Sequence, residues 1–152
     1  MKKVELLAPA GDIERLKFAY LYGADACYIG GRDFSLRANA TNFSIEEIKE
    51  ACNIAHKMNK KLYVTVNIVF QNDDFTGLVE YLKSLEDAKV DAIIVSDPSV
   101  IEIVKDNNIN LNIHISTQYS SSNTEVVSFF KSLGCERVVL SRELSKNEIK
   151  EI

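Results

Sequence analysis

The sequence lacks the paired cysteines that hold metals and clusters. Its 152 residues include three cysteines, Cys27, Cys52 and Cys135, which lie far apart and form no CxxC or CxxH pair. Such pairs are the usual sequence signal of zinc and iron–sulfur sites, so no metal site is expected within this chain. Three separated thiols are typical of buried, unreactive side chains.

Long apolar runs and a basic excess are also absent. No run of about 18 apolar residues occurs, so no membrane-spanning helix is expected. The apolar stretch before Gly11 is too short for the core of a signal peptide, and a cytoplasmic protein is expected. The net charge of −4 gives no general attraction to nucleic acid, but it leaves a local basic patch as an alternative.

Familiar phosphate-binding and hydrolytic motifs are missing as well. There is no GxxxxGK[ST] loop, and the dinucleotide-binding glycine pattern is absent after the first two predicted strands. No HExxH motif occurs. Ser116 follows His114 by two residues and so points the same way one pleat further on, which is poor geometry for a nucleophile and its base. The residues themselves therefore show no mechanism for peptide hydrolysis.

What the sequence does contain is an alternation of strand and helix. Short apolar segments predict six strands, at Val4–Ala8, Ala24–Gly30, Leu62–Phe70, Val90–Ser96, Leu111–Ser116 and Arg137–Leu140. Helical apolar spacing follows each strand, and capping residues such as Asp12, Ser44 and Ser145 mark helix starts. One helix is expected from about Asp74 to Ala88. This order indicates parallel strands with right-handed crossovers.

Two architectures fit the alternation, a doubly wound open sheet and a (β/α) barrel. Polar residues at the carboxyl ends of the strands favour the barrel, which needs eight units and about 250 residues. The expected fold is therefore α/β and TIM-barrel-like, with six βα units of an incomplete barrel. Residues 1–152 are expected to form a single domain, the N-terminal portion of a longer catalytic barrel. A complete six-stranded sheet is the alternative.

A long polar loop follows the second predicted strand. Tyr28–Phe43 reads YIGGRDFSLRANATNF and shows no helical period before Ser44. Gly30 and Gly31 allow a sharp turn or a close approach of the backbone, while the arginines and asparagines supply charge and neutral hydrogen-bonding groups. Loops of this length are usually functional or disordered, and the apolar residues within this one argue against disorder.

Six blocks of sequence, in order along nearly the whole chain, match one family. They are ELLAPAGD at Glu5–Asp12, GADACYIGG at Gly23–Gly31, FSLRANATNF at Phe34–Phe43, YVTVN at Tyr63–Asn67, HISTQ at His114–Gln118 and RVVLSRELS at Arg137–Ser145. With these blocks the chain resembles the peptidase U32 proteins, the collagenase-like proteases. The resemblance implies a TIM-barrel-like catalytic domain and an enzyme described as a peptidase without a settled mechanism.

Hydrolysis of peptide bonds is therefore the main functional expectation. The resemblance also implies an alternative, because other members act in hydroxylating transfer RNA, ribosomal RNA or the ubiquinone ring. Those members carry an iron–sulfur cluster on cysteines beyond the matched region. No cofactor is expected within this chain. An iron–sulfur cluster on a part of the protein that follows it is an open alternative. The expected substrate is a peptide or an RNA. A third hypothesis is a non-catalytic domain whose arginine-rich loop holds an anion.

The candidate site residues lie at the carboxyl ends of strands or in the long loop. Asp97, His114 and Glu143 are expected to act as acid or base. Substrate binding is expected of Arg37, Asn42, Asn67, Gln118 and Arg142. Each catalytic candidate also has a structural interpretation: Asp97 as a helix cap, Glu143 as an ion-pair partner, His114 as a core histidine. Glu5 is a candidate buried acid bonded to His114 or Arg137.

The first and last predicted strands lack a neighbour if the barrel is incomplete. Both are apolar, VELLA and RVVLS, and unpaired apolar edges promote association. Covering inner side chains such as Leu7, Ile94 and Val139 is favourable by about 25 cal/mol per Å². We therefore expect self-association through the open edges, as a symmetric dimer. Closure of the gap by the last helix or the Arg32–Phe43 loop is the monomeric alternative.

Overall fold

The computed structural model describes residues 4–36 and 42–152. Within them six parallel strands form one sheet in the order β1-β2-β3-β4-β5-β6. The strands are β1 (Leu7–Pro9), β2 (Ala26–Gly30), β3 (Lys61–Val66), β4 (Ala92–Val95), β5 (Ile113–Ile115) and β6 (Arg137–Val138). The predicted order is confirmed, and a doubly wound sheet is excluded because the order never reverses.

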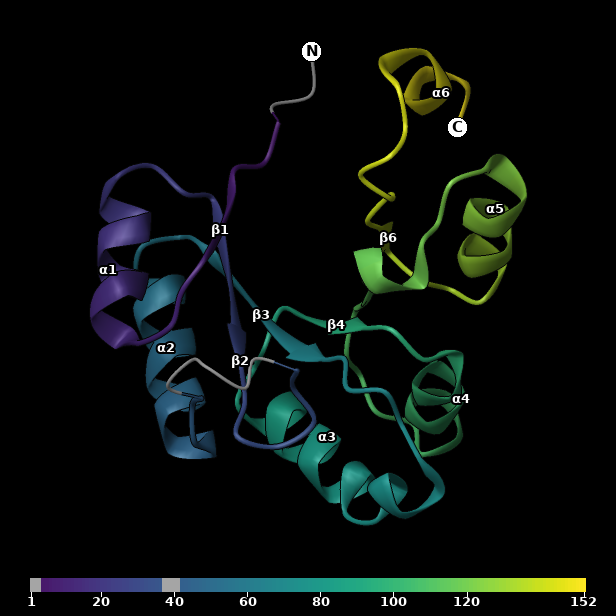
Figure 1. The fold of residues 1–152 in the computed structure, drawn as a ribbon. Coiled ribbons are helices and arrows are strands. Elements are labelled where there is room, and N and C mark those ends of the chain that lie inside the picture. The colour runs from purple at the N-terminus through teal and green to yellow at the C-terminus, as the bar shows by residue number, and fades with distance from the viewer. Residues whose placement is uncertain (1–3, 37–41) are drawn as a thin grey trace.

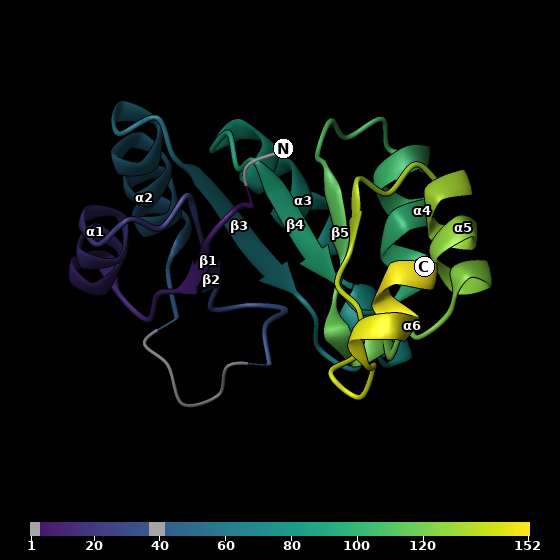
Figure 2. The same cartoon turned by 90° about the horizontal axis from the view of Figure 1, so that it is seen from above.

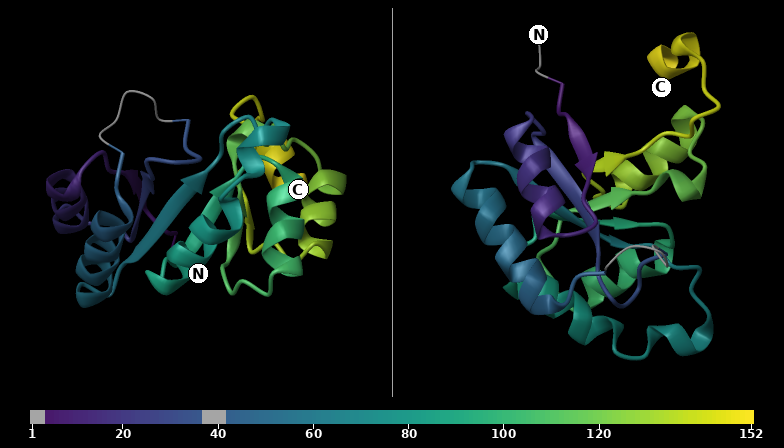
Figure 3. Two further views of the ribbon diagram at one scale, coloured as in Figure 1. Left: turned by 90° about the horizontal axis from the view of Figure 1, so that it is seen from below. Right: turned by 60° about the vertical axis from the view of Figure 1, so that its left-hand side comes forward.

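Helices alternate with the strands and lie on the outside of the sheet. They are α1 (Ile13–Leu21), α2 (Ile45–Lys57), α3 (Leu78–Asp87), α4 (Pro98–Asp106), α5 (Thr124–Ser132) and α6 (Lys146–Glu151). The sheet curls into half of a barrel, with α1 to α5 on its convex side (Figures 1 and 2). The strands β1 and β6 border the open half, and both views of Figure 3 show the same curl.

The main core lies between the convex face of the sheet and the helices. It takes strand residues such as Ile29, Val64, Ile93 and Ile115, and helix residues such as Leu16, Ile48, Leu82, Ile101 and Phe130. A second, smaller group of buried side chains lies on the concave face and comprises Ala26, Tyr63, Ala92 and Ile94, with Leu7 and Tyr28 packed against it. Because successive strand residues point to opposite faces, the concave group is where a site can form.

Hydrogen bonds explain why two strands differ from the predicted ranges. The sheet begins at Leu7 rather than Val4, since the backbone N–H of Leu6 donates to the Asp25 carboxylate at 3.0 Å instead of to a strand. β3 ends at Val66 rather than at residue 70. The next two backbone N–H groups, of Asn67 and Ile68, donate to the carbonyl of Phe34 in the long loop, at 2.8 and 3.3 Å.

The helix predicted from about residue 74 is interrupted near its start. A short 3-10 turn, η1 (Asn72–Phe75), comes first, and α3 begins only at Leu78. Gly77 lies between them with φ of 80°, in the left-handed region that breaks a helix and suits glycine. The remaining helices and strands start and end within a few residues of the predicted ranges.

Candidate functional site

The concave face carries two layers of inward side chains, and the layer nearer the amino ends of the strands is a closed polar network. Arg137, at the start of β6, and the Tyr63 hydroxyl, on β3, both donate to the carboxylate of Glu5, the tyrosine at 3.0 Å. The guanidinium also lies 5.6 Å from the centre of the Tyr63 ring. Glu5 precedes β1, so this network joins the two edges of the half-barrel.

Charge within this network is balanced. Burial alone would raise the pKa of Glu5, but hydrogen bonds from Arg137 and Tyr63 outweigh it and hold that pKa below its ordinary value. Of the two partners expected for Glu5, the structure shows Arg137. The network is well satisfied, which is typical of a structural layer rather than of a binding site.

His114 belongs to this lower layer and not to the mouth. Its ring packs edge-on against Tyr63 at 4.6 Å, and the side chain is 2% exposed. Burial, with the nearby charge of Arg137, lowers the pKa of His114 to about 4, so the ring is neutral at pH 7. The expected acid–base role of His114 stays a prediction. The imidazole ring lies one layer below the side chains that line the cavity described next.

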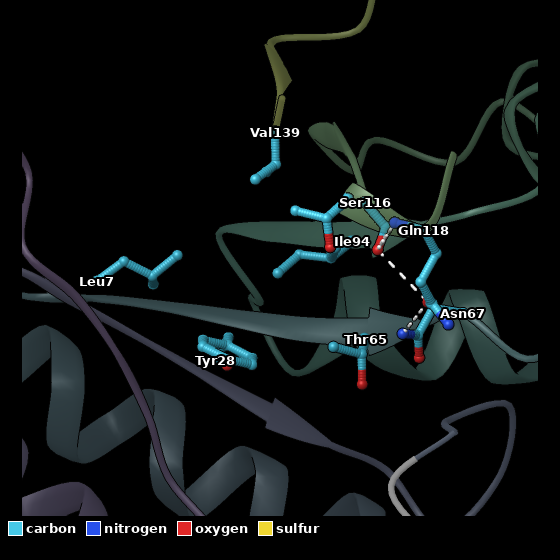
Figure 4. A pocket seen from close by; sticks show the side chains of 9 residues that line it. Leu7, Tyr28, Thr65, Asn67, Ile94, Ser116, Gln118 and Val139 are labelled. Atoms are coloured by element: carbon cyan, nitrogen blue, oxygen red, sulfur yellow. Dashed lines mark hydrogen bonds between the residues drawn. The ribbon is translucent and has the colours of Figure 1, made fainter. Parts of the chain in front are cut away.

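The upper layer lines an open cavity of about 390 Å³ at the carboxyl ends of the strands (Figure 4). Its walls are the side chains of Leu7, Tyr28, Ile94 and Val139, and its polar groups come from Thr65, Asn67, Ser116, Thr117 and Gln118. None of these described lining residues is charged. A neutral, partly apolar hollow of this size suits an uncharged ring rather than a free anion.

Asn67 and Gln118 meet across the top of this cavity. The Asn67 side-chain amide donates to Oε1 of Gln118 at 2.6 Å, and the Ser116 hydroxyl donates to the same oxygen at 3.4 Å. Figure 4 shows the three side chains side by side. β3 and β5 bring them together, because parallel strands end at the same edge of the sheet. Asn67 directly follows β3, and Gln118 lies three residues after β5, in the 3-10 turn Thr117–Tyr119.

The long loop is fastened to the same edge. Ser35 Oγ and Thr65 Oγ1 lie 2.8 Å apart, and the backbone N–H of Leu36 donates to Oδ1 of Asn67 at 3.3 Å. The Phe34 ring stacks on Phe70 with centroids 6.1 Å apart. This part of the loop is therefore ordered by the end of β3, as its apolar residues predicted.

The other candidate residues are spread around this end of the molecule. Asp97 caps α4 by accepting from the backbone N–H of Ser99 at 2.9 Å, and it lines a neighbouring hollow that also includes Gln118. Oδ1 of Asn42 points toward Gly30, 3.3 Å from the position that a Cβ would take there. This oxygen is buried and has no hydrogen-bond partner among residues 4–36 and 42–152.

The predicted gathering of seven side chains at one mouth is only partly observed. Arg142 and Glu143 follow β6 as exposed side chains, and neither makes a hydrogen bond or ion pair in the described part of the chain. The ion pair that was the structural alternative for Glu143 is thus not seen in this part of the chain, and its acid–base role stays a prediction. Arg37 lies outside the described residues. Asn67 and Gln118 are the pair that the fold brings into direct contact.

Sequence reasoning missed the apolar walls of the cavity as site residues. Leu7, Tyr28, Ile94 and Val139 face inward on four different strands or strand ends. Leu7, Ile94 and Val139 were expected on the inner face only as apolar area in need of cover. Counting back in steps of two from Gly30 at the end of the second strand would have found Tyr28 as well, because alternate residues share a face.

The described residues offer no cluster that fits a metal or an iron–sulfur centre. Residues 4–36 and 42–152 contain no group of three histidine, cysteine or acidic side chains able to hold an ion. Cys27 and Cys52 are buried, and burial raises the pKa of both thiols, that of Cys52 to about 12, which disfavours the thiolate that a cluster needs. In the same part of the chain, no helix is long and apolar enough to cross a membrane.

Comparison with known proteins gives a consistent family. The model of peptidase family U32 matches residues 11–152. The chain is 52% identical over 99% of its length to tRNA hydroxylation protein P1 of Bacillus subtilis, of which it covers 36%. It is 43% identical over 99% of its length to tRNA hydroxylation protein P of Haemophilus influenzae, of which it covers 33%. The chain thus spans about a third of these relatives.

A solved structure supports the fold independently. The U32 peptidase Mk0906 matches 99% of this chain with a TM-score of 0.80, at 15% sequence identity and over 64% of its own length. At that identity the likeness shows the TIM-barrel-like fold alone.

The comparisons correct the main functional expectation. Hydrolysis of peptide bonds was expected from the family's name, whereas the relatives at 52% and 43% identity are named for hydroxylation of transfer RNA. The cavity agrees with this correction, because the Ser116 hydroxyl is hydrogen-bonded to Gln118 and, within the described residues, not to His114. The peptidase expectation is therefore wrong, and the alternative of RNA hydroxylation is the better supported.

Proposed function

The chain belongs to peptidase family U32, and from that premise we propose that it is the N-terminal part of the barrel of an enzyme that hydroxylates a base of transfer RNA. The observation that carries the proposal is the 52% identity, over 99% of this chain, to a tRNA hydroxylation protein. The matched region spans 99% of this chain, so the match extends over the part of the fold that forms the cavity as well as over the core.

The geometry of the cavity supports a base as the group that is bound. Enzymes that modify a base must first take it out of its stack and hold it in a pocket that contacts its edge and its faces. The cavity of about 390 Å³ supplies apolar walls from Leu7, Ile94 and Val139, and the Asn67–Gln118 amides at its rim. In this proposal these residues bind and orient the base.

Hydroxylation also requires a redox group, and an iron–sulfur cluster would supply electron transfer when bound. The cysteines of this chain do not fit one, since Cys27 and Cys52 are buried in separate elements with raised thiol pKa values. We therefore propose that any cluster is held by residues outside 1–152. Iron and sulfide analysis of the protein at its native length tests this part.

Loss of the gene is the direct test of the proposed function. We expect nucleosides from the transfer RNA of a deletion strain to lack one hydroxylated base, seen by mass spectrometry as a nucleoside with one oxygen fewer. A plasmid with the gene at native length should restore it. An unchanged set of transfer RNA nucleosides would overturn the proposal. If a hydroxylated base were lost from ribosomal RNA alone, the substrate would be ribosomal RNA and not transfer RNA.

A further inference from the structure

A second hollow adjoins the cavity at the carboxyl ends of β3 and β4. It has a volume of about 400 Å³ and is lined by Ile68, Val69, Phe70, Ser96, Asp97 and Gln118. Among the described residues, Gln118 is the one that lines both this second hollow and the cavity of about 390 Å³. Its side chain therefore stands between two spaces of nearly equal size.

Gln118 is held in place although it is exposed to solvent. The Asn67 amide donates to its Oε1 at 2.6 Å, and the Ser116 hydroxyl, which accepts from the backbone N–H of Gln118 at 3.3 Å, donates to the same Oε1 at 3.4 Å. Figure 4 shows the side chain reaching to Asn67, away from Leu7 and Tyr28. An exposed glutamine otherwise moves among several rotamers, so these bonds make it a fixed projection.

The second hollow has the chemistry of a site for a base. Its apolar side is the segment after β3, where Val69 is 78% exposed and Phe70 is half-buried. Apolar and aromatic side chains bind the flat face of a base. Asp97 is the single charged side chain among the described lining residues. A carboxylate repels a phosphate but accepts hydrogen bonds from a base, so the hollow suits a base rather than the sugar–phosphate backbone.

We infer that the second hollow holds the base next to the one in the cavity, and that Gln118 is a wedge between the two bases. A base that is to be modified must leave its stack, and some proteins separate stacked bases by inserting a side chain between them. Bases on opposite sides of Gln118 cannot stack on each other. Asn67 is a positioning residue, because it acts by holding Gln118. This inference rests on the proposed function and extends it to a neighbouring nucleotide.

The fluorescence of 2-aminopurine tests the wedge, because this base analogue is quenched when it is stacked and brightens when it is unstacked. The transfer RNA that loses its hydroxylated base in the deletion strain supplies the sequence of a synthetic stem–loop. The analogue replaces the neighbour of that base on one side in a first RNA and on the other side in a second. We expect the native-length protein to brighten one of the two RNAs severalfold on binding.

Substitutions separate the wedge from a merely structural role. Gln118→Ala should still bind the stem–loop but lose most of the brightening. Asn67→Ala should lose it too, because Gln118 is no longer held, whereas Asn67→Asp should retain it, since a rotated Gln118 amide donates to the carboxylate. Val69→Glu adds a second carboxylate to the hollow and should weaken binding by about tenfold, because the charge loses water when a base covers it.

Gln71→Ala is the matched control. Gln71 is also exposed and also follows β3, but it is not among the described residues that line either hollow, so the affinity and the brightening should be unchanged. If the unmodified protein does not bind the stem–loop, the proposed function itself fails. If it binds, and Gln118→Ala brightens the analogue as much as the unmodified protein does, RNA binding stands and the wedge is wrong.

Discussion

Protonation of His114 is opposed by the groups packed around it. The ring is 2% exposed and lies against Tyr63; the charges near it are Arg137, Glu136, whose carboxylate is 3.7 Å from Nε2, and Glu5. Burial and the guanidinium outweigh the acids, and the pKa of His114 falls to about 4. An unfolded histidine takes up its proton near pH 6.5, so the unfolded state binds more protons between these two values.

The stability of the chain should therefore decline on mild acidification. The contribution of a neutral His114 is complete above about pH 6.5 and is lost as the pH falls toward 4. We expect the free energy of unfolding, from urea titrations, to fall by about 2 kcal/mol between pH 7 and pH 5.

Substitution identifies the residue responsible. His114→Gln should remove most of this decline, while His56→Gln, at a half-exposed position bonded to Asp91, should retain it. Equal slopes in His114→Gln and the unmodified chain would show that other groups cause the pH dependence.

At the scale of elements, the long loop packs closely against α3 because Gly31 has no side chain. A Cβ built on Gly31, just after β2, would lie 2.0 Å from the hydroxyl oxygen of Tyr81 on α3. That hydroxyl is buried and has no hydrogen-bond partner among the described residues. Glycine is therefore required here for close approach and not for a special backbone angle.

A double substitution tests this contact. Gly31→Ala should lower the free energy of unfolding by about 2 kcal/mol through overpacking. Tyr81→Phe alone should be neutral or stabilising, because it removes an unpaired buried hydroxyl. In the double variant the alanine should be tolerated much better, as the nearest ring atom, Cζ, lies 3.1 Å from the added carbon. Additive effects in urea unfolding would contradict direct contact.

At the scale of the whole molecule, the two edges of the half-barrel expose apolar side chains. On the β1 side, Val4 is 87% exposed and Tyr22 at the end of α1 is 86% exposed. On the β6 side, Phe129 and Ile149 are about half exposed. Within the described residues β1 and β6 each pair with one strand, which leaves each an open edge. We propose that the chain self-associates through these edges.

Light scattering at micromolar concentration should give the mass of a symmetric dimer for the 152-residue chain. Tyr22→Lys places a charge at the α1 edge and should weaken the dimer at least about tenfold, since burying an unpaired charge is unfavourable. Val69→Lys is the control, because Val69 is 78% exposed but follows β3, away from both edges. A monomer mass for the unmodified chain would refute the dimer.

The sequence by itself determined the repeated architecture. Each strand and helix is set by local signals, such as the apolar run of β3 and the Ser44–Glu47 capping box of α2. In that box each of the two side chains accepts a hydrogen bond from the backbone N–H of the other residue. Parallel strands in sequential order then follow from the alternation. For the same reason, Asn67 and Gln118 could be named as site residues, because both lie just beyond the carboxyl ends of predicted strands.

Only the tertiary structure decided which polar side chains meet. The curvature of the sheet puts His114 beside Tyr63 in the lower layer and brings Asn67 to Gln118 at the rim, across β4. The end of β3 likewise depended on the loop, since Phe34 takes the hydrogen bonds that would have extended the strand. These contacts join residues far apart in the chain, so no local pattern encodes them, and they arise only when the sheet curls.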